Sequence, residues 1–343
     1  MILVEEGQSP LILCLPHSGT EIPNAVLNRL NATGRLQTDL SWRIERVFGF
    51  HKELDATLLR SSISRYVIDV DKDPQTPLSA AQDPATALCP ITTLDGKRIY
   101  QPGEEPGPTE IEQRSLLFCM PFLRALRKQI DRLLRKHDRI VIVNCQSMRS
   151  NIKGVTDTGL PLISIGSSNG TSCDPQLRNQ LVGAFRDHED YSVGVDGYAG
   201  GGFIERSYGR PNRGIHVVTL LLAQRAYLRH ETPPFEPDKT RTPRLSAVLA
   251  KTMSGVVDWA ESPGTAGTKP MPREPEIASD TLPDTGHPET RSAAPRKACA
   301  SGVSADRSAE KIIPADPLEL PKVAGSRLVD VKEGPVAPLL VAE

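Results

Sequence analysis

Short apolar runs alternate with longer amphipathic segments over the first 260 residues of the chain. Four runs have the length and composition of buried strands, and they lie at residues 11–15, 64–70, 140–143 and 162–166. A fifth run, at 215–222, is long enough to be either a strand or a buried helix. These runs predict the strands of a sheet that is covered on both faces, because a strand buried on both faces is apolar throughout.

Apolar residues recur at helical spacing in five segments, at residues 22–30, 39–54, 109–136, 174–185 and 241–261. The most regular of them is 109–136, where Leu123, Leu126 and Ile130 share one face and charged residues occupy the other. Pro121 should kink this helix or split it in two, because proline lacks the N–H that an interior helical position needs. Strands that alternate with helices predict an α/β fold.

Polar residues gather immediately after two of the predicted strands. Asn144, Cys145, Gln146 and Ser147 follow residues 140–143, and the sequence Pro-His-Ser-Gly at 16–19 follows residues 11–15. Ligand sites in open α/β sheets lie beyond the carboxyl ends of the strands, so these two turns are where a site is expected. The alternative is an ordinary exit from strand to loop.

Composition narrows the class of protein. The 41 basic and 42 acidic residues nearly cancel, which argues against a nucleic-acid partner, and no apolar run approaches the roughly 20 residues of a membrane span. The six cysteines include no CxxC pair, so neither a disulfide framework nor a cysteine zinc site is expected. The chain is predicted to be cytoplasmic, because its N-terminus lacks the pattern of a signal peptide.

Two segments lack a periodic apolar pattern. Residues 75–108 read as one long loop, and loops of that length inside a domain are often functional lids. Residues 261–343 are rich in proline, alanine, serine and charge, and are predicted to form a disordered tail with a possible role in binding a protein partner. The expected organisation is therefore one domain over 1–260 and a tail over 261–343.

Five stretches together resemble the N-formylglutamate amidohydrolase (deformylase) family in order and spacing. They are PHSG at 16–19, SRYVID at 64–69, QSMRS at 146–150, GGFIERSYGRP at 201–211 and GIHVVTLLLAQRAYL at 214–228. The resemblance implies a single-domain, three-layer α/β sandwich with a mixed sheet, of the phosphorylase/hydrolase-like type related to zinc exopeptidases. It also implies zinc-activated water that cleaves N-formylglutamate to formate and glutamate.

The chain departs from the pattern of that family where polar residues are expected. Asn144-Cys145-Gln146-Ser147 stands in place of Asp-Ala-His-Ser, and Asp39-Leu40-Ser41-Trp42-Arg43 in place of Asp-Thr-Asp-Trp-His. Ser207, Leu221 and Leu123 replace a histidine, a glutamate and a histidine. Serine and glutamine are poor zinc ligands and arginine stays protonated, so the zinc is expected to be lost and no metal ligand is assigned.

The candidate site residues come from the turns and from the matching motifs. His17, Gln146 and Cys145 are the catalytic candidates, and Ser18, Arg65, Asp69, Ser147, Arg149, Arg206, Tyr208, Arg210 and His216 are the candidates for binding substrate. Arginines suit the carboxylates of a small ligand such as an N-acyl amino acid. Each arginine is as readily structural, His216 as readily a core histidine, Tyr208 a packed ring, and Asp69 the partner of either His17 or an arginine.

Two hypotheses about function follow. In the first, the protein is a degenerate family member that keeps a carboxylate-binding cleft and has lost metal-dependent hydrolysis. In the second, it remains a hydrolase of N-formyl or N-acyl amino acids with a remodelled site, in which Cys145 attacks the substrate and His17 acts as the base.

Overall fold

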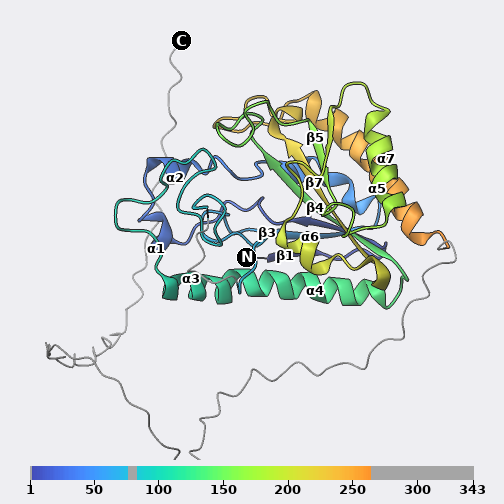
Figure 1. The fold of residues 1–343 in the computed structure, drawn as a ribbon, viewed down its shortest axis with the longest axis horizontal. Coiled ribbons are helices and arrows are strands. Elements are labelled where there is room, and N and C mark those ends of the chain that lie inside the picture. The colour runs from blue at the N-terminus through green and yellow to red at the C-terminus, as the bar shows by residue number, and fades with distance from the viewer. Residues whose placement is uncertain (1, 76–82, 264–343) are drawn as a thin grey trace, which may run out of the picture. The chain divides into compact units, whose positions relative to one another are not determined.

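A seven-stranded mixed sheet forms the centre of the computed structural model, which describes residues 2–75 and 83–263 (Figure 1). Across the sheet, the strands are β1 (Ile2–Glu5), β3 (Thr57–Ser61), β2 (Leu11–Leu15), β4 (Ile140–Met148), β7 (Ile215–Ala223), β5 (Ile163–Gly166) and β6 (Val193–Val195). The pairs β1–β3 and β5–β7 are antiparallel, and the other neighbours are parallel.

Helices cover both faces of this sheet, so the protein has the three layers that were expected. Leu11, Leu13 and Leu15 of β2 pack in one core with α5 (Pro175–Arg186) and α7 (Arg241–Glu261). Ile12 and Cys14 point to the opposite face, into a second core with α4 (Met120–Leu134) and the short α6 (Phe203–Tyr208). Both faces of β2 are therefore apolar, as burial on two sides requires.

The long helix predicted at 109–136 contains a π-helical turn just before Pro121. It consists of α3 (Pro108–Arg114), a π-helical turn at Ser115–Cys119, and α4. Pro121 lies in the first turn of α4, and the π turn just before it accommodates a residue that has no N–H to donate. The backbone stays helical through both junctions, so the helix is continuous and is not split in two (Figure 1).

Two predicted elements are wrong. Residues 39–54 form no α-helix but a loop with two 3-10 turns, Ile44–Arg46 and Gly49–Lys52, and Arg43 has a left-handed backbone with φ of 57°. Residues 64–70 are buried but turn instead of pairing as a strand, and the strand lies upstream at β3. In both cases the apolar residues are buried, as their spacing indicated, but they are buried by tertiary packing and not as part of a regular helix or strand.

Other predictions agree closely with the structure. The run at 215–222 is a strand, β7, and the helices predicted at 174–185 and 241–261 are α5 and α7. The segment at 22–30 contains the short helix α1 (Asn24–Leu27), which α2 (Ala32–Leu36) follows. Further 3-10 turns lie at Pro211–Arg213 and Gln224–Ala226.

The described residues belong to one compact unit, whereas the predicted tail at 261–343 lies outside them from residue 264 onward. Over the two described ranges, no helix has both the length and the apolar character needed to cross a membrane.

Candidate functional site

Strand β4 continues through the polar residues that were expected to form a turn. All nine of its residues pair with β7, from Ile140 opposite Ile215 to Met148 opposite Ala223. Because successive side chains of a strand point to opposite faces, Asn144 and Gln146 share the face of Ile142, toward α4 and α6. Cys145 points to the other face, into the core with α5 and α7.

A buried carboxylate, Asp71, receives the two amides of β4. Its Oδ2 accepts hydrogen bonds from Asn144 Nδ2 at 3.0 Å and from Gln146 Nε2 at 2.7 Å, and its Oδ1 accepts one from the backbone N–H of Ile204 at 2.8 Å. A Cβ atom on Gly202 would lie 2.5 Å from Oδ2, so only glycine fits there. We call Asp71, Asn144 and Gln146 the Asp71 cluster. Burial and the neighbouring Asp69 raise the pKa of Asp71.

Asp69, two residues earlier, is held by His17 and Arg65. His17 Nε2 lies 2.6 Å from Oδ1, and Arg65 Nε donates to Oδ2 at 2.9 Å. Oδ1 also accepts the N–H of Asp71 at 3.0 Å, which links Asp69 to the Asp71 cluster. Burial alone would raise the pKa of Asp69, but the charges of His17 and Arg65 outweigh it and hold the pKa well below its usual range.

A third buried carboxylate, Glu205 of α6, is bound by hydroxyl groups. Thr219 Oγ1 donates to Oε2 and Ser168 Oγ to Oε1, each at 2.5 Å. Thr219 lies opposite Asn144 in the β4–β7 pairing, so Glu205 adjoins the Asp71 cluster across the sheet. Three carboxylates thus lie near the carboxyl ends of the central strands. Both oxygens of each already have a hydrogen-bond or ion-pair partner within the protein.

This arrangement does not fit the zinc ion that the family resemblance implies. Among residues 2–75 and 83–263, no group of three or more His, Cys, Asp or Glu side chains is placed to hold a metal ion. The groups around Asp71 are N–H donors, which cannot coordinate a cation. Oδ1 of Asn144 has no partner among the described residues, but one neutral amide oxygen is a poor zinc ligand.

The substituted family positions have structural roles or face solvent. Ser41 Oγ accepts the N–H of Ser147 at 2.8 Å and so ties its loop to β4, whereas Arg43 is exposed. Leu221 lies opposite Gln146 and packs in a small apolar cluster with Leu160 and Ala223. Position 221 therefore carries an apolar side chain in place of the carboxylate that the family pattern has there.

The three catalytic candidates are not brought together. His17 contacts Asp69 and Gln146 contacts Asp71, but Cys145 lies in the core, and its thiol donates to the carbonyl of Val143 at 3.3 Å. Burial raises the pKa of Cys145 well above its usual range, which opposes the thiolate that a nucleophile needs. The placement of Cys145 therefore does not support a role in attack on a substrate.

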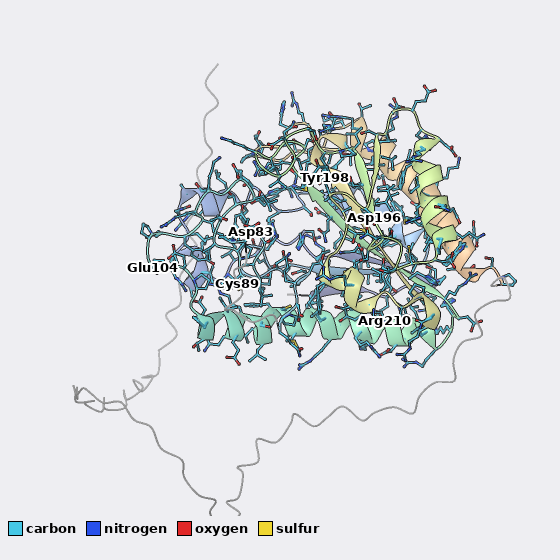
Figure 2. All side chains as sticks on the ribbon, viewed as in Figure 1. Asp83, Cys89, Glu104, Asp196, Tyr198 and Arg210 are labelled. Atoms are coloured by element: carbon cyan, nitrogen blue, oxygen red, sulfur yellow. The ribbon has the colours of Figure 1, made fainter. Side chains whose placement is uncertain are left out.

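Of the four candidate arginines, Arg149 is the one that directly follows the carboxyl end of β4. Arg65 is buried, and its guanidinium is engaged by Asp69 and by the carbonyl of Ala85 at 3.1 Å. Arg206 and Arg210 are exposed. Figure 2 shows Arg210 far from Asp83, a residue of the predicted loop at 75–108 that also contains Asp95. Arg149 follows β4 directly and donates to Asp39 at 2.9 Å and to Asp95 at 3.2 Å.

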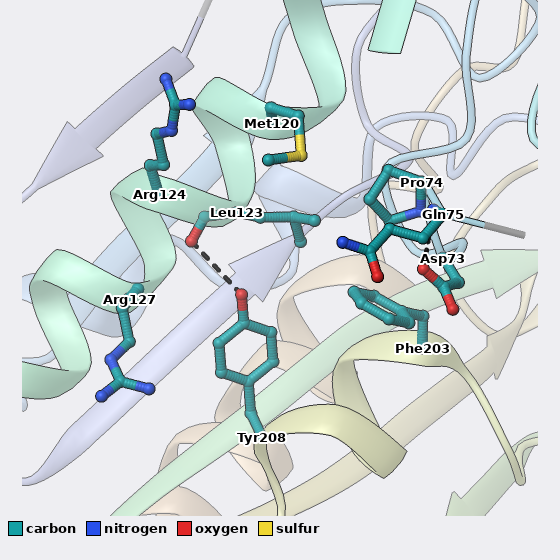
Figure 3. A pocket seen from close by; sticks show the side chains of 9 residues that line it. All are labelled: Asp73, Pro74, Gln75, Met120, Leu123, Arg124, Arg127, Phe203 and Tyr208. Carbon is teal, nitrogen blue, oxygen red and sulfur yellow. Dashed lines mark hydrogen bonds between the residues drawn. The ribbon is translucent and has the colours of Figure 1, made fainter. Parts of the chain in front are cut away.

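The other binding candidates lie elsewhere or have internal partners. Ser18 Oγ donates to the carbonyl of Leu15, and Ser147 Oγ lies 2.7 Å from the hydroxyl of Tyr227. Tyr208 lines a separate hollow of about 370 Å³ between α4 and α6, where its hydroxyl donates to the carbonyl of Leu123 (Figure 3).

His216 lies at the opposite end of the sheet, because it pairs with Val141 near the start of β4. It packs edge-on against Trp259 at 4.9 Å, and its Nδ1 accepts the N–H of Asp174 at 3.1 Å. Burial lowers the pKa of His216 to about 4. It is the core histidine that was the alternative interpretation.

Sequence reasoning missed Asp71, Glu205, Asp39 and Asp95 as site residues. A signal for Asp71 was present, since the spacing Asp69-Val70-Asp71 after an apolar run places two carboxylates at one exit. Glu205 lies inside a motif that matched the family, at GGFIERSYGRP. No local signal identifies Asp39 and Asp95, whose contacts with Arg149 span 110 and 54 residues of sequence.

Comparison with known proteins gives consistent results. The family model for N-formylglutamate amidohydrolase matches residues 9–228. N-formylglutamate deformylase of Pseudomonas putida is 32% identical over 255 residues, which cover 74% of this chain and 94% of that protein. The Pseudomonas aeruginosa deformylase is 31% identical over 256 residues, which cover 74% of this chain and 95% of that protein.

The fold is also found in a solved structure. The crystal structure of N-formylglutamate amidohydrolase from Ralstonia eutropha superposes with a TM-score of 0.63 at 21% sequence identity. The match covers 76% of this chain and 97% of that one. At this identity the likeness shows the shared fold.

Proposed function

The chain belongs to the N-formylglutamate amidohydrolase family, and from this premise we propose that it is a degenerate member which binds a small carboxylate ligand without hydrolysing it. The ligand class is that of N-acyl amino acids, and the relatives are named for one of them, N-formylglutamate. The proposal has two parts, the loss of metal-dependent hydrolysis and the retention of an anion site.

One observation carries the first part: neutral amides surround Asp71 where a hydrolytic site would need metal ligands. A catalytic zinc needs about three protein ligands from His, Asp, Glu or Cys, with one position left for water. Here Asn144 and Gln146 donate N–H groups to Asp71 at 3.0 and 2.7 Å. These bonds engage the oxygens of the buried carboxylate with neutral donors, which supports the loss of the metal.

The second part rests on Arg149. Guanidinium groups bind carboxylates through paired N–H bonds, and Arg149 lies at the carboxyl end of the central strand with a buried Nε that has no partner among the described residues. A ligand carboxylate would satisfy that donor.

One observation favours the second candidate function, an active hydrolase with a remodelled site. His17 Nε2 lies 2.6 Å from Asp69, which would orient the ring so that Nδ1 faces away from the carboxylate and can take a proton. Water would lose a proton to Nδ1 as its oxygen bonds to the formyl carbon. The C–N bond would then break as that proton passes to the departing nitrogen, giving formate and a free amino acid.

Formate release and ligand binding, measured on the same preparation, test the proposal. The purified full chain would be incubated with N-formyl-L-glutamate, with and without added zinc, and the Pseudomonas putida deformylase would serve as the positive control. We expect heat of binding by calorimetry but no formate. Release that His17→Ala abolishes and a chelator does not affect would favour the remodelled hydrolase. Release that the chelator abolishes would contradict the proposal, because metal-dependent activity would persist.

A protein partner for the C-terminal segment and a cytoplasmic location stay predictions from the sequence. Pull-down with the full chain and with a chain ending at residue 263 would test the first, and fractionation of cells would test the second.

A further inference from the structure

Arg149 already holds two carboxylates of its own chain. Its Nη2 donates to Asp39 Oδ1 at 2.9 Å and to Asp95 Oδ1 at 3.2 Å. Its side chain is 19% exposed, and its Nε is buried without a partner among the described residues. One guanidinium nitrogen therefore serves two anions while another serves none, an arrangement that leaves a hydrogen bond unmade.

The two carboxylates differ in how firmly they are held. Asp39 is 1% exposed, and its Oδ2 accepts from the hydroxyl of Tyr66 and from the N–H of Leu94, both at 2.8 Å. It has a full set of partners and belongs to the permanent framework of the site.

Asp95 lies instead at the tip of a surface turn. The turn is closed by the bond from Thr93 N–H to the carbonyl of Lys97 at 2.8 Å, and Gly96 in it has a φ of 81°. The Asp95 side chain is 14% exposed, and its Oδ2 contacts Nζ of Lys97 at 2.9 Å, a lysine that is 67% exposed. Asp95 can therefore leave Arg149 and keep a cationic partner in water.

We propose that Arg149 anchors the carboxylate of the ligand and that Asp95 is a resident carboxylate which the ligand displaces. This inference rests on the proposed function, because it concerns the same anion site. Exchange of one carboxylate for another leaves the charge around Arg149 unchanged, so the buried Asp39 keeps its counterion. The incoming ligand gains the Nε donor that Asp95 does not reach, which makes the new contact bidentate.

The exchange sets the ligand class and the direction of a mutational effect. A ligand must carry a carboxylate, because a neutral amide cannot replace the charge that Asp95 withdraws. Removal of the charge at residue 95 should tighten binding, since the ligand then competes with an amide instead of a carboxylate. Asp95 acts in this way as a residue that sets affinity and selectivity without itself touching the bound ligand.

Calorimetry with two probes and three variants tests the inference. N-formyl-L-glutamate is titrated into the wild-type full chain and into Asp95→Asn, and N-formyl-L-glutamine serves as the probe with one carboxylate fewer. We expect Asp95→Asn to bind N-formyl-L-glutamate about twofold to fivefold more tightly, the range for loss of one partly exposed competing ion pair. Asp190→Asn breaks a different Asp–Arg pair, with the exposed Arg244, and should leave affinity unchanged.

Arg149→Lys provides the complementary measurement. It keeps the charge beside Asp39, and so the fold, but removes the planar fork, and affinity should fall at least tenfold. Unchanged or weaker binding by Asp95→Asn would overturn the inference, as would unchanged binding by Arg149→Lys. Equal binding by wild type and Asp95→Asn without formate release would leave the proposed function standing and reject the role of Asp95. Formate release together with tighter binding by Asp95→Asn would reject the proposed function and leave the role of Asp95 standing.

Discussion

Asp69 and Asp71 are two residues apart and are buried to nearly the same degree, yet the protein stabilises them by opposite means. Asp69 is 1% exposed and contacts His17 and Arg65, which carry or can carry positive charge. Asp71 is 5% exposed and contacts the side-chain amides of Asn144 and Gln146 and a backbone N–H, all of them neutral. The pKa of Asp69 is lowered and that of Asp71 is raised.

The difference shows which part of the site still has charge balance. Around Asp69, positive groups offset the carboxylate, so the ion pair is self-contained and costly to break. Around Asp71, hydrogen bonds from neutral donors compensate for lost hydration, and the charge interaction with His17 offsets only part of the effects of burial and of Asp69. The groups in direct contact with Asp71 are amides where a metal site would need further ligands, and this contrast supports the proposed loss of metal chemistry.

The largest expected effect comes from neutralising Asp69. Asp69→Asn would leave Arg65 buried without its carboxylate and should lower the free energy of unfolding by about 3–5 kcal/mol at pH 7. A lowered pKa contributes stability above the ordinary value of 3.8 and loses it as pH falls below that value, so the gap between variant and wild type should narrow in acid. Urea unfolding at several pH values measures both effects.

Asp131→Asn is the matched control, because Asp131 pairs with Arg127 on the exposed side of α4. Its cost should stay below about 1 kcal/mol. Equal losses in the two variants would mean that the buried pair around Asp69 contributes no more than a surface pair.

A second carboxylate beside Asp71 should be nearly as disruptive. Asn144→Asp would place two uncompensated anions in a buried site and should cost about 2–3 kcal/mol at pH 7, equivalent to about two pKa units. Carboxyl groups with raised pKa values bind protons more tightly in the folded state, so folding is favoured in acid and this penalty should shrink as pH falls. Thermal unfolding from pH 7 to pH 4 measures the trend, and Asn151→Asp, at an exposed position, should show none.

The pair of carboxylates that Asn144→Asp creates with Asp71 should accept a metal ion once a third ligand is supplied. In the double variant Asn144→Asp, Gln146→His, three metal-binding side chains would meet at the cluster, because positions 144 and 146 both contact Asp71. Zinc at a hundred times its dissociation constant should then stabilise the variant by about 2.7 kcal/mol. Differential scanning calorimetry with and without zinc measures the gain. No zinc-dependent shift in the double variant, or an equal shift in the wild type, would contradict this account of Asp71.

The sequence predicts the fold far better than it predicts the cluster. Strands β2, β4 and β7 and helices α4, α5 and α7 follow from local apolar spacing, because each element buries its own stripe against the sheet. Residues 64–70 show the limit of that reasoning. Tyr66, Val67 and Ile68 are as apolar as a strand and just as buried, but after an isolated bridge at Ser64 the backbone turns instead of pairing.

The site depends on where β4 ends, which local pattern did not reveal. If Asn144 to Met148 are taken as a turn, the sequence does not show which way each side chain points. Cys145 and Gln146 then both become candidates for catalysis. As a strand, the same residues alternate, so Gln146 meets Asp71 and Cys145 enters the core. The extension arises from pairing with β7, which lies about 75 residues further along the chain, and single-segment reasoning has no access to it.

The smallest expected effect isolates the hydrogen bonds of the Asp71 cluster from its charge. Gln146→Leu keeps the volume of the side chain and removes only the amide that donates to Asp71 at 2.7 Å. Loss of one bond to a charged acceptor should cost about 1–2 kcal/mol in urea unfolding. Gln180→Leu, at an exposed residue that donates to the neutral carbonyl of Gly255, is the control and should cost less. If the two losses were equal, the amides would not be what stabilises Asp71, and the contrast with Asp69 would need another cause.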